Sequence, residues 1–119
     1  MNKVKQSEYH PKGWGYELWI ANSDKYCGKL LFFNKGKKCS YHYHRRKTET
    51  FYIQSGKILL RYGEGNEIEE AEEVILGAGD VFDAPQLLRH QMEAIEDTEL
   101  FEFSTYHSEG DSYKVVKGD

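Results

Sequence analysis

The sequence has no long apolar run. It contains no stretch of about eighteen apolar residues, and its first residues, MNKVKQSEYHPKG, lack the hydrophobic segment of a secretory signal. We therefore expect a cytoplasmic protein that has no membrane partner. An excess of positive charge is missing as well, because the formal net charge is −4. Without a positive field to hold a phosphate backbone, nucleic acid is not an expected partner.

Cysteine is scarce. The two cysteines, Cys27 and Cys39, are too few for a disulfide scaffold and have neither C-x-x-C nor zinc-knuckle spacing. We expect them to be reduced and to act as small hydrophobic residues in strands. The chain has 119 residues, of which 39% are hydrophobic and 30% charged, a composition typical of one globular domain. We therefore look for a single active centre.

Short segments rich in β-branched and aromatic residues alternate with turn signals such as Ser55-Gly56 and Gly77-Ala78-Gly79. This pattern predicts an all-β domain, a sandwich or a barrel, over residues 1–119. The barrel core is expected at about residues 16–107, between an N-terminal arm (1–12) and a loosely attached C-terminal tail (108–119). The predicted strands cover residues 16–21, 28–33, 40–44, 49–54, 57–62, 73–76, 80–84 and 99–106.

One stretch allows a different interpretation. In residues 83–99, Asp83 could cap a helix, and Leu88, Met92 and Ile95 follow helical spacing. A short helix there would turn His90 away from the position that a strand would give it. The acidic run at residues 64–73 is interpreted as a solvated loop or an exposed hairpin edge.

The segment GKKCSYHYHRRKTETFYIQSG contains two histidines one residue apart. Because side chains alternate faces along a strand, His42 and His44 share one face, about 7 Å apart at Cα, and can lean onto one metal ion. Glu49 has the opposite parity, so a turn over residues 45–48 would have to place its carboxylate on a neighbouring antiparallel strand beside the histidines. The alternative is a surface patch in which Glu49 pairs with Arg45 or Arg46.

The wider pattern around these histidines favours the metal site. Gly36, His42, His44, Glu49 and Gly56 resemble the first signature motif of the cupin superfamily at every fixed position.

A second cupin motif follows at the expected distance. Gly79, Pro85 and His90 resemble it, although Leu87 stands where a glycine is usual and Ala94 where an asparagine is usual. The two motifs and the segments between and around them extend the resemblance over about residues 12–107.

The resemblance implies a double-stranded β-helix, or jelly-roll barrel, in which His42, His44, Glu49 and His90 bind one divalent transition metal. Three imidazoles and a carboxylate suit Fe, Mn, Ni, Co, Cu or Zn, and an octahedral ion would keep open positions. The segments HPKGWGYELWI and LFEFSTYHSEGDSYKVV also resemble the flanks of type II mannose-6-phosphate isomerase cupins, although those proteins often have glutamine in place of His42.

Three functions remain open. The first is a sugar or sugar-phosphate isomerase or epimerase that uses the metal as a Lewis acid, with Glu102, Tyr106, His107 or a metal-bound hydroxide as the base. The others are an iron-dependent oxygenase and a non-catalytic carbohydrate- or metal-binding module. No catalytic residue can be assigned. A small-molecule substrate, with a sugar phosphate as the leading candidate, is expected to contact Arg61, Met92, Phe103 and Tyr106.

Several predicted strands are apolar on both faces, among them Leu30-Leu31-Phe32-Phe33. Both faces must then be covered, and a second copy of the chain can provide one cover. A two-fold homodimer is therefore expected.

Overall fold

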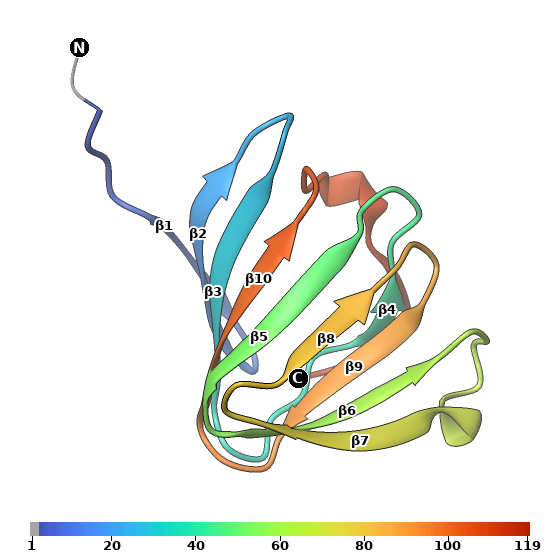
Figure 1. The fold of residues 1–119 in the computed structure, drawn as a ribbon. Coiled ribbons are helices and arrows are strands. Elements are labelled where there is room, and N and C mark those ends of the chain that lie inside the picture. The colour runs from blue at the N-terminus through green and yellow to red at the C-terminus, as the bar shows by residue number, and fades with distance from the viewer. Residues whose placement is uncertain (1–2) are drawn as a thin grey trace.

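The computed structural model describes residues 3–119, which form two antiparallel sheets that face each other (Figure 1). The strands are β1 (Glu8–Lys12), β2 (Gly15–Asn22), β3 (Cys27–Phe33), β4 (Tyr41–Tyr43), β5 (Glu49–Ser55), β6 (Lys57–Gly63), β7 (Glu72–Gly77), β8 (Val81–Ala84), β9 (Arg89–Ala94), β10 (Thr98–Ser104) and β11 (Tyr113–Val116). Two short 3-10 turns, η1 (Ile68–Glu70) and η2 (Glu109–Asp111), interrupt them. None of the helical segments described is long and apolar enough to cross a membrane.

The strand order confirms the predicted jelly roll. One sheet has the order β1-β2-β3-β10-β5-β8 and the other β11-β4-β9-β6-β7, so the chain passes repeatedly from sheet to sheet. Several neighbouring strands come from distant parts of the sequence, for example β3 beside β10 and β4 beside β9. Side chains separated by tens of residues therefore meet between the sheets.

The core lies between the two sheets and follows the period-two alternation of each strand. In β3, Cys27, Lys29, Leu31 and Phe33 are buried, and the residues between them are more exposed. Apolar side chains fill one part of the interior. The buried core cluster consists of Trp14, Leu31, Phe33, Phe51, Ile53, Ile58, Leu60, Leu76, Ala84, Met92, Ala94 and Leu100.

The eight predicted strands are present, and three further strands accompany them. Residues 89–94 form β9 rather than a helix, so His90 takes the strand position. The predicted N-terminal arm includes β1, which pairs with β2, while its residues 1–2 lie outside the described residues. The predicted tail is tied to the barrel, because β11 pairs with β4 and Asp119 N donates to Lys38 O at 2.8 Å. Both cysteines are free, as expected.

The turn before β9 has Leu87 at a position where a glycine is usual, and Leu87 adopts the left-handed backbone conformation that a glycine would have there. Its φ angle is 73°, the only positive φ of a non-glycine residue in the described chain. A left-handed conformation costs an L-residue about 1–2 kcal/mol. The turn is nevertheless held in place, because Leu87 N donates to His44 O at 2.8 Å.

We predict that Leu87→Gly will not destabilise the protein and will stabilise it by up to about 1 kcal/mol. Relief of the left-handed strain outweighs the greater freedom of glycine in the unfolded chain, and little packing is lost because Leu87 is 52% exposed. Urea denaturation measures the change. Leu88→Gly is the control and should destabilise, because Leu88 packs against the core. A clear loss of stability in Leu87→Gly would contradict the assignment of strain.

Candidate metal centre and cavity

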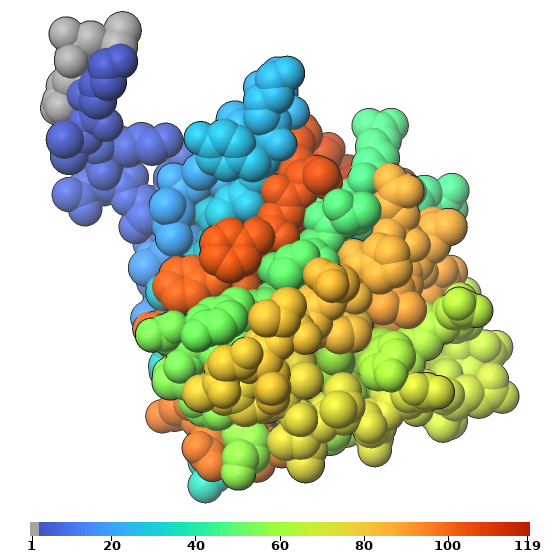
Figure 2. All heavy atoms as spheres, viewed as in Figure 1, coloured from blue at the N-terminus to red at the C-terminus, as the bar shows by residue number. Residues whose placement is uncertain are grey.

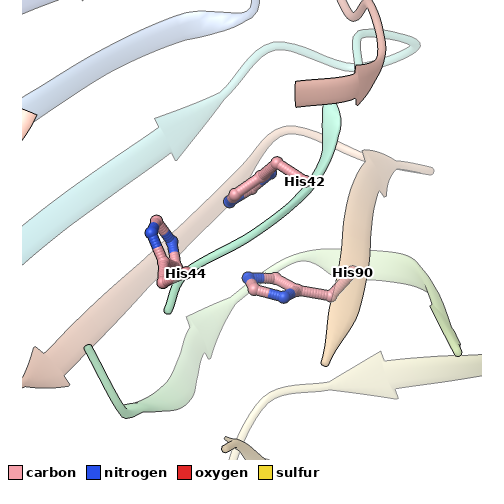
Figure 3. A group of neighbouring side chains, drawn as sticks. All are labelled: His42, His44 and His90. Atoms are coloured by element: carbon pink, nitrogen blue, oxygen red, sulfur yellow. The ribbon is translucent and has the colours of Figure 1, made fainter. Parts of the chain in front are cut away.

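Three histidines converge between the sheets. His42 lies on β4, His44 follows its last residue, and His90 on β9 is the cross-strand partner of His42. Their ligand-capable nitrogen atoms all lie within 4.8 Å of one another. Figure 3 shows the three rings turned toward one shared space. Strand alternation and one cross-strand pairing are sufficient to bring them together.

Each of these rings is oriented by a backbone carbonyl. The Nδ1 atoms of His42, His44 and His90 lie 2.8 Å from Ser40 O, 2.7 Å from Asp111 O and 3.0 Å from Leu88 O. A carbonyl oxygen can only accept, so Nδ1 must donate the hydrogen in each case. In a neutral ring Nε2 then carries the lone pair, which is the arrangement of a metal-binding histidine.

Glu49 lies beside two of the three histidines. Its Oε1 lies 3.3 Å from His44 Nε2 and 3.2 Å from His90 Nε2. Neither Glu49 Oε1 nor His90 Nε2 has a hydrogen-bond partner among the described residues, although both are buried, so these short contacts lack hydrogen-bond geometry. Buried polar atoms left in this state are costly. A cation between them would satisfy both, so the residues present fit a divalent metal.

The electrostatics agree with that fit. Burial and the neighbouring His90 and His44 lower the pKa of His42 to about 3, so this ring is neutral at pH 7. Burial raises the pKa of Glu49, but contacts with His44, His90 and Lys47 outweigh it and hold the pKa well below the ordinary value. Burial lowers the pKa of His90, but the Glu49 carboxylate raises it by more, so the pKa of His90 is above its ordinary value. Metal binding would compete with the proton on that ring.

The turn that carries Glu49 differs from the sequence interpretation. Glu49 begins β5, which belongs to the opposite sheet and pairs with β10 and β8 rather than with β4. Residues 45–48 therefore cross from one sheet to the other. The carboxylate of Asp111 holds this crossing, accepting from the backbone N–H groups of Arg45, Arg46 and Lys47 at 2.9–3.2 Å.

Asp111 was not identified from the sequence. It lies in η2, far along the chain, and is buried. Burial raises the pKa of Asp111. Hydrogen bonds from the backbone N–H groups of Arg45, Lys47 and Arg46 lower that pKa by more, so the net effect is a decrease. Its carbonyl also orients His44. One residue thus supports both sides of the crossing between the histidine pair and Glu49.

We predict that Asp111→Ala will destabilise the protein by about 2–3 kcal/mol, because three backbone N–H groups lose a charged acceptor. Asp111→Asn is the matched variant and should lose less, since its amide oxygen still accepts. Urea denaturation measures both. Equal, near-zero losses in the two variants would show that the carboxylate does not hold the crossing.

The cluster opens into a cavity of about 590 Å³ between the sheets. His42, His44, Glu49 and His90 line one part of it together with Phe51 and Met92. The remaining interior is unexpectedly polar. A second group of side chains lines the cavity and is called here the interior charged group: Glu17, Trp19, Lys29, Lys47, Glu102 and His107.

Lys47 joins the interior charged group to the metal cluster. Its Nζ lies 3.3 Å from Glu49 Oε2, donates to Glu102 Oε2 at 3.1 Å, and lies 3.0 Å from His107 Nδ1. Burial lowers the pKa of Lys47, but the carboxylates of Glu102 and Glu49 raise it to a net increase. Burial, Lys47 and Lys29 lower the pKa of His107 to about 4. The ring of His107 is therefore neutral at pH 7 and can accept from Lys47.

The predicted substrate contacts are only partly at the cavity. Met92 lines it. Arg61, Phe103 and Tyr106 do not, and Phe103 and Tyr106 are 54% and 51% exposed. Arg61 instead donates to Glu73 and Glu93 at 2.9 and 2.8 Å. Phe103 points outward because β10 turns Leu100 and Glu102 to the inside.

Sequence reasoning missed Trp19, Lys29 and Lys47. Lys29 had a usable signal, because it interrupts the apolar parity of β3 at a position whose neighbours Cys27, Leu31 and Phe33 are all buried. Charged residues are rarely buried at inward positions of a strand unless they are paired or have a specific role.

Solved structures share this fold. The capsular polysaccharide assembling protein CapF from Staphylococcus aureus superimposes with a TM-score of 0.80 at 19% identity, over 93% of this chain and 34% of CapF. Oxalate decarboxylase from Bacillus subtilis gives 0.79 at 17% identity, over 91% of this chain and 30% of that one. KdgF from Halomonas sp. gives 0.74 at 19% identity, over 87% and 91%.

The chain thus spans about a third of CapF and of oxalate decarboxylase, and most of KdgF. At these identities the likeness establishes the fold alone. No curated protein matches the sequence. Residues 30–106, however, match the family model of the cupin domain, over both motifs and all four predicted metal ligands. The chain is a member of the cupin family.

Proposed function

We propose that this cupin binds one divalent transition metal through His42, His44, His90 and Glu49, and that it acts on a sugar or sugar phosphate as an isomerase or epimerase. The observation that carries the metal site is the pair of buried atoms, Glu49 Oε1 and His90 Nε2, that lack hydrogen-bond partners among the described residues. A bound ion would supply Lewis-acid polarisation of a substrate carbonyl or hydroxyl oxygen. The resemblance to type II mannose-6-phosphate isomerase cupins supports the sugar substrate.

The interior charged group provides the proton-transfer groups that such a reaction needs. Of the base candidates from the sequence, Glu102 and His107 line the cavity and Tyr106 does not. Burial and the charge of Glu49 raise the pKa of Glu102 despite Lys47, so its carboxyl can hold a proton. Lys47 Nζ and Ser104 Oγ both donate to Glu102 Oε2, which leaves Oε1 to exchange a proton with a substrate.

Metal content tests the central site. We predict that the purified protein contains about one transition-metal ion per chain, and that the double variant His42→Ala/His44→Ala loses it while circular dichroism shows the fold retained. Removal of two of four ligands abolishes tight binding, because the remaining two cannot satisfy the ion. Elemental analysis by mass spectrometry makes the measurement. His10→Ala, a histidine outside the cluster, is the control and should keep the metal, and an unchanged metal content in the double variant would refute the site.

Two other functions use the same site. Three imidazoles and one carboxylate with open positions also suit an iron-dependent oxygenase. Oxygen consumption by the iron-loaded protein with a catechol, thiol or enol substrate would favour that reaction. Incorporation of solvent deuterium into a sugar under anaerobic conditions would favour the isomerase or epimerase. Sugar binding with neither reaction would leave a binding module.

The outer face of the six-stranded sheet supports a homodimer. Tyr52, Val81 and Phe103 are 36%, 57% and 54% exposed on adjacent strands, and Tyr52 lies between Phe101 and Val81 in the register. Figure 2 shows aromatic rings of β10 and β5 side by side on this surface. A contiguous apolar patch of this kind is typical of a subunit interface.

We therefore expect light scattering to give twice the chain mass of 13.9 kDa. Phe103→Glu should shift the protein to the monomer, since a charge in the interface cannot be buried unpaired. Ile75→Glu changes an equally exposed residue of the other sheet and should leave the dimer intact. A monomeric wild-type protein would exclude the proposed interface.

A further inference from the structure

Lys29 is a buried cation whose hydrogen-bonding capacity is unused. Its side chain is 2% exposed and lines the cavity from the inner face of β3. The nearest acid is Glu17, whose Oε1 lies 3.6 Å from Lys29 Nζ, beyond hydrogen-bond range. Among the described residues, Nζ donates no hydrogen bond at all. An ammonium group has three donors, and those of Lys29 face the cavity with no protein acceptor in hydrogen-bond range.

The surroundings of Lys29 hold the ammonium in place. Trp19 lies beneath it, with its ring centroid 4.4 Å from Nζ. The ring of His10 stacks on Trp19 with a centroid distance of 3.9 Å, and Trp19 Nε1 donates to Glu17 Oε1 at 2.8 Å. The indole is therefore fixed by both a neighbouring ring and a hydrogen bond. Lys29 is positioned by a cation–π contact that leaves its N–H groups available.

Lys47, the other buried lysine, is different. It contacts Glu49, Glu102 and His107 within 3.3 Å, so its donors are already engaged. Of the two lysines inside the barrel, Lys29 alone can offer hydrogen bonds to a ligand.

The net charge of the buried side chains indicates the charge of the ligand that Lys29 would bind. Two buried lysines, Lys29 and Lys47, face three glutamates, Glu17, Glu49 and Glu102, which leaves one negative charge when all are ionised. A divalent ion at the histidine cluster reverses this to one positive charge. A ligand with a single negative charge would neutralise these five buried side chains and the ion together.

We propose that Lys29 forms a subsite for a carboxylate of the substrate, in the same cavity as the metal cluster. This inference rests on the proposed function of that cavity and narrows its substrate class from sugars and sugar phosphates to sugar acids. A carboxylate suits the site better than a phosphate dianion, because the buried side chains and the ion leave one positive charge when every buried acid is ionised, and no arginine lines the cavity. The carboxylate accepts from Lys29 Nζ, while the rest of the substrate extends toward the histidines.

Three probes with the same ring test the subsite by isothermal titration calorimetry on the full, metal-loaded chain. Glucuronate, glucose and glucose 6-phosphate differ only in carrying a carboxylate, a hydroxyl or a phosphate at the same end. We expect glucuronate to bind at least about tenfold more tightly than glucose and more tightly than glucose 6-phosphate. Lys29→Met should reduce glucuronate binding to the level of glucose. Lys25→Met is the control, because Lys25 is exposed and lies outside the cavity, and it should bind as the wild type does.

Each other result overturns the proposal. Glucuronate binding no tighter than glucose binding, or unaffected by Lys29→Met, excludes a carboxylate subsite at this lysine. Tighter binding of glucose 6-phosphate assigns the subsite to phosphate instead. If Lys29→Met fails to fold, Glu17→Gln/Lys29→Met removes both charges together and leaves no unpaired buried acid, and the same loss is expected of it.

Metal analysis of the same samples separates the two proposals. A wild-type protein that takes up no metal refutes the proposed function, whatever the titrations show. A Lys29→Met variant that keeps its metal and binds glucuronate as the wild type does refutes the subsite alone.

Discussion

The hydrogen bonds from three histidine Nδ1 atoms to three backbone carbonyls are the interaction on which the rest of the site depends. They set the tautomer and the direction of each ring before any ligand arrives. Two of the acceptors, Ser40 and Leu88, lie two residues before the histidine that they orient, so local backbone geometry is enough. The third acceptor, Asp111, comes from a distant segment, so the orientation of His44 is a property of the complete fold.

Burying this many polar groups requires that they support one another. Lys47 lies between Glu49 and Glu102, and its positive charge favours the ionised form of both carboxylates. The same lysine holds Glu49 Oε2, so that Oε1 is left facing the histidines. The interior charged group and the histidine cluster are therefore one electrostatic unit, in which Lys47, Glu102 and His107 lie next to Glu49 and the histidines.

Much of the fold follows from local patterns. Alternating apolar segments between glycine turns were sufficient to locate eight strands, and Gly36 and Gly56 adopt the positive φ that their turns need. Strand β9 was ambiguous because Leu88, Met92 and Ile95 also fit a helix, and only pairing with β6 and β4 decides it. The short β1 and β11 were missed, because pairing partners rather than their own residues stabilise them.

The residues of the site that belong to a sequence motif were predictable, and the others were not. His42, His44, Glu49 and His90 were found through the resemblance of two motifs to those of cupins, and the structure brings them together, while their role as ligands stays a prediction. The inner face of β10 was not predictable, because it carries Glu102 while the outer face carries Phe103, the reverse of the usual pattern. Asp111 acts on residues far from it in the sequence, and no local rule links it to them.

The placement of Asp111 has a consequence for how the protein is made. Both imidazoles of the H-x-H pair and the acid of the first motif are synthesised early, but the acceptor that aims His44 and the carboxylate that secures the crossing emerge from the ribosome more than sixty residues later. A nascent chain that exposes the early histidines does not yet hold them in a binding geometry. The orientation of the His44 ring is therefore completed only when the last part of the chain has joined the barrel.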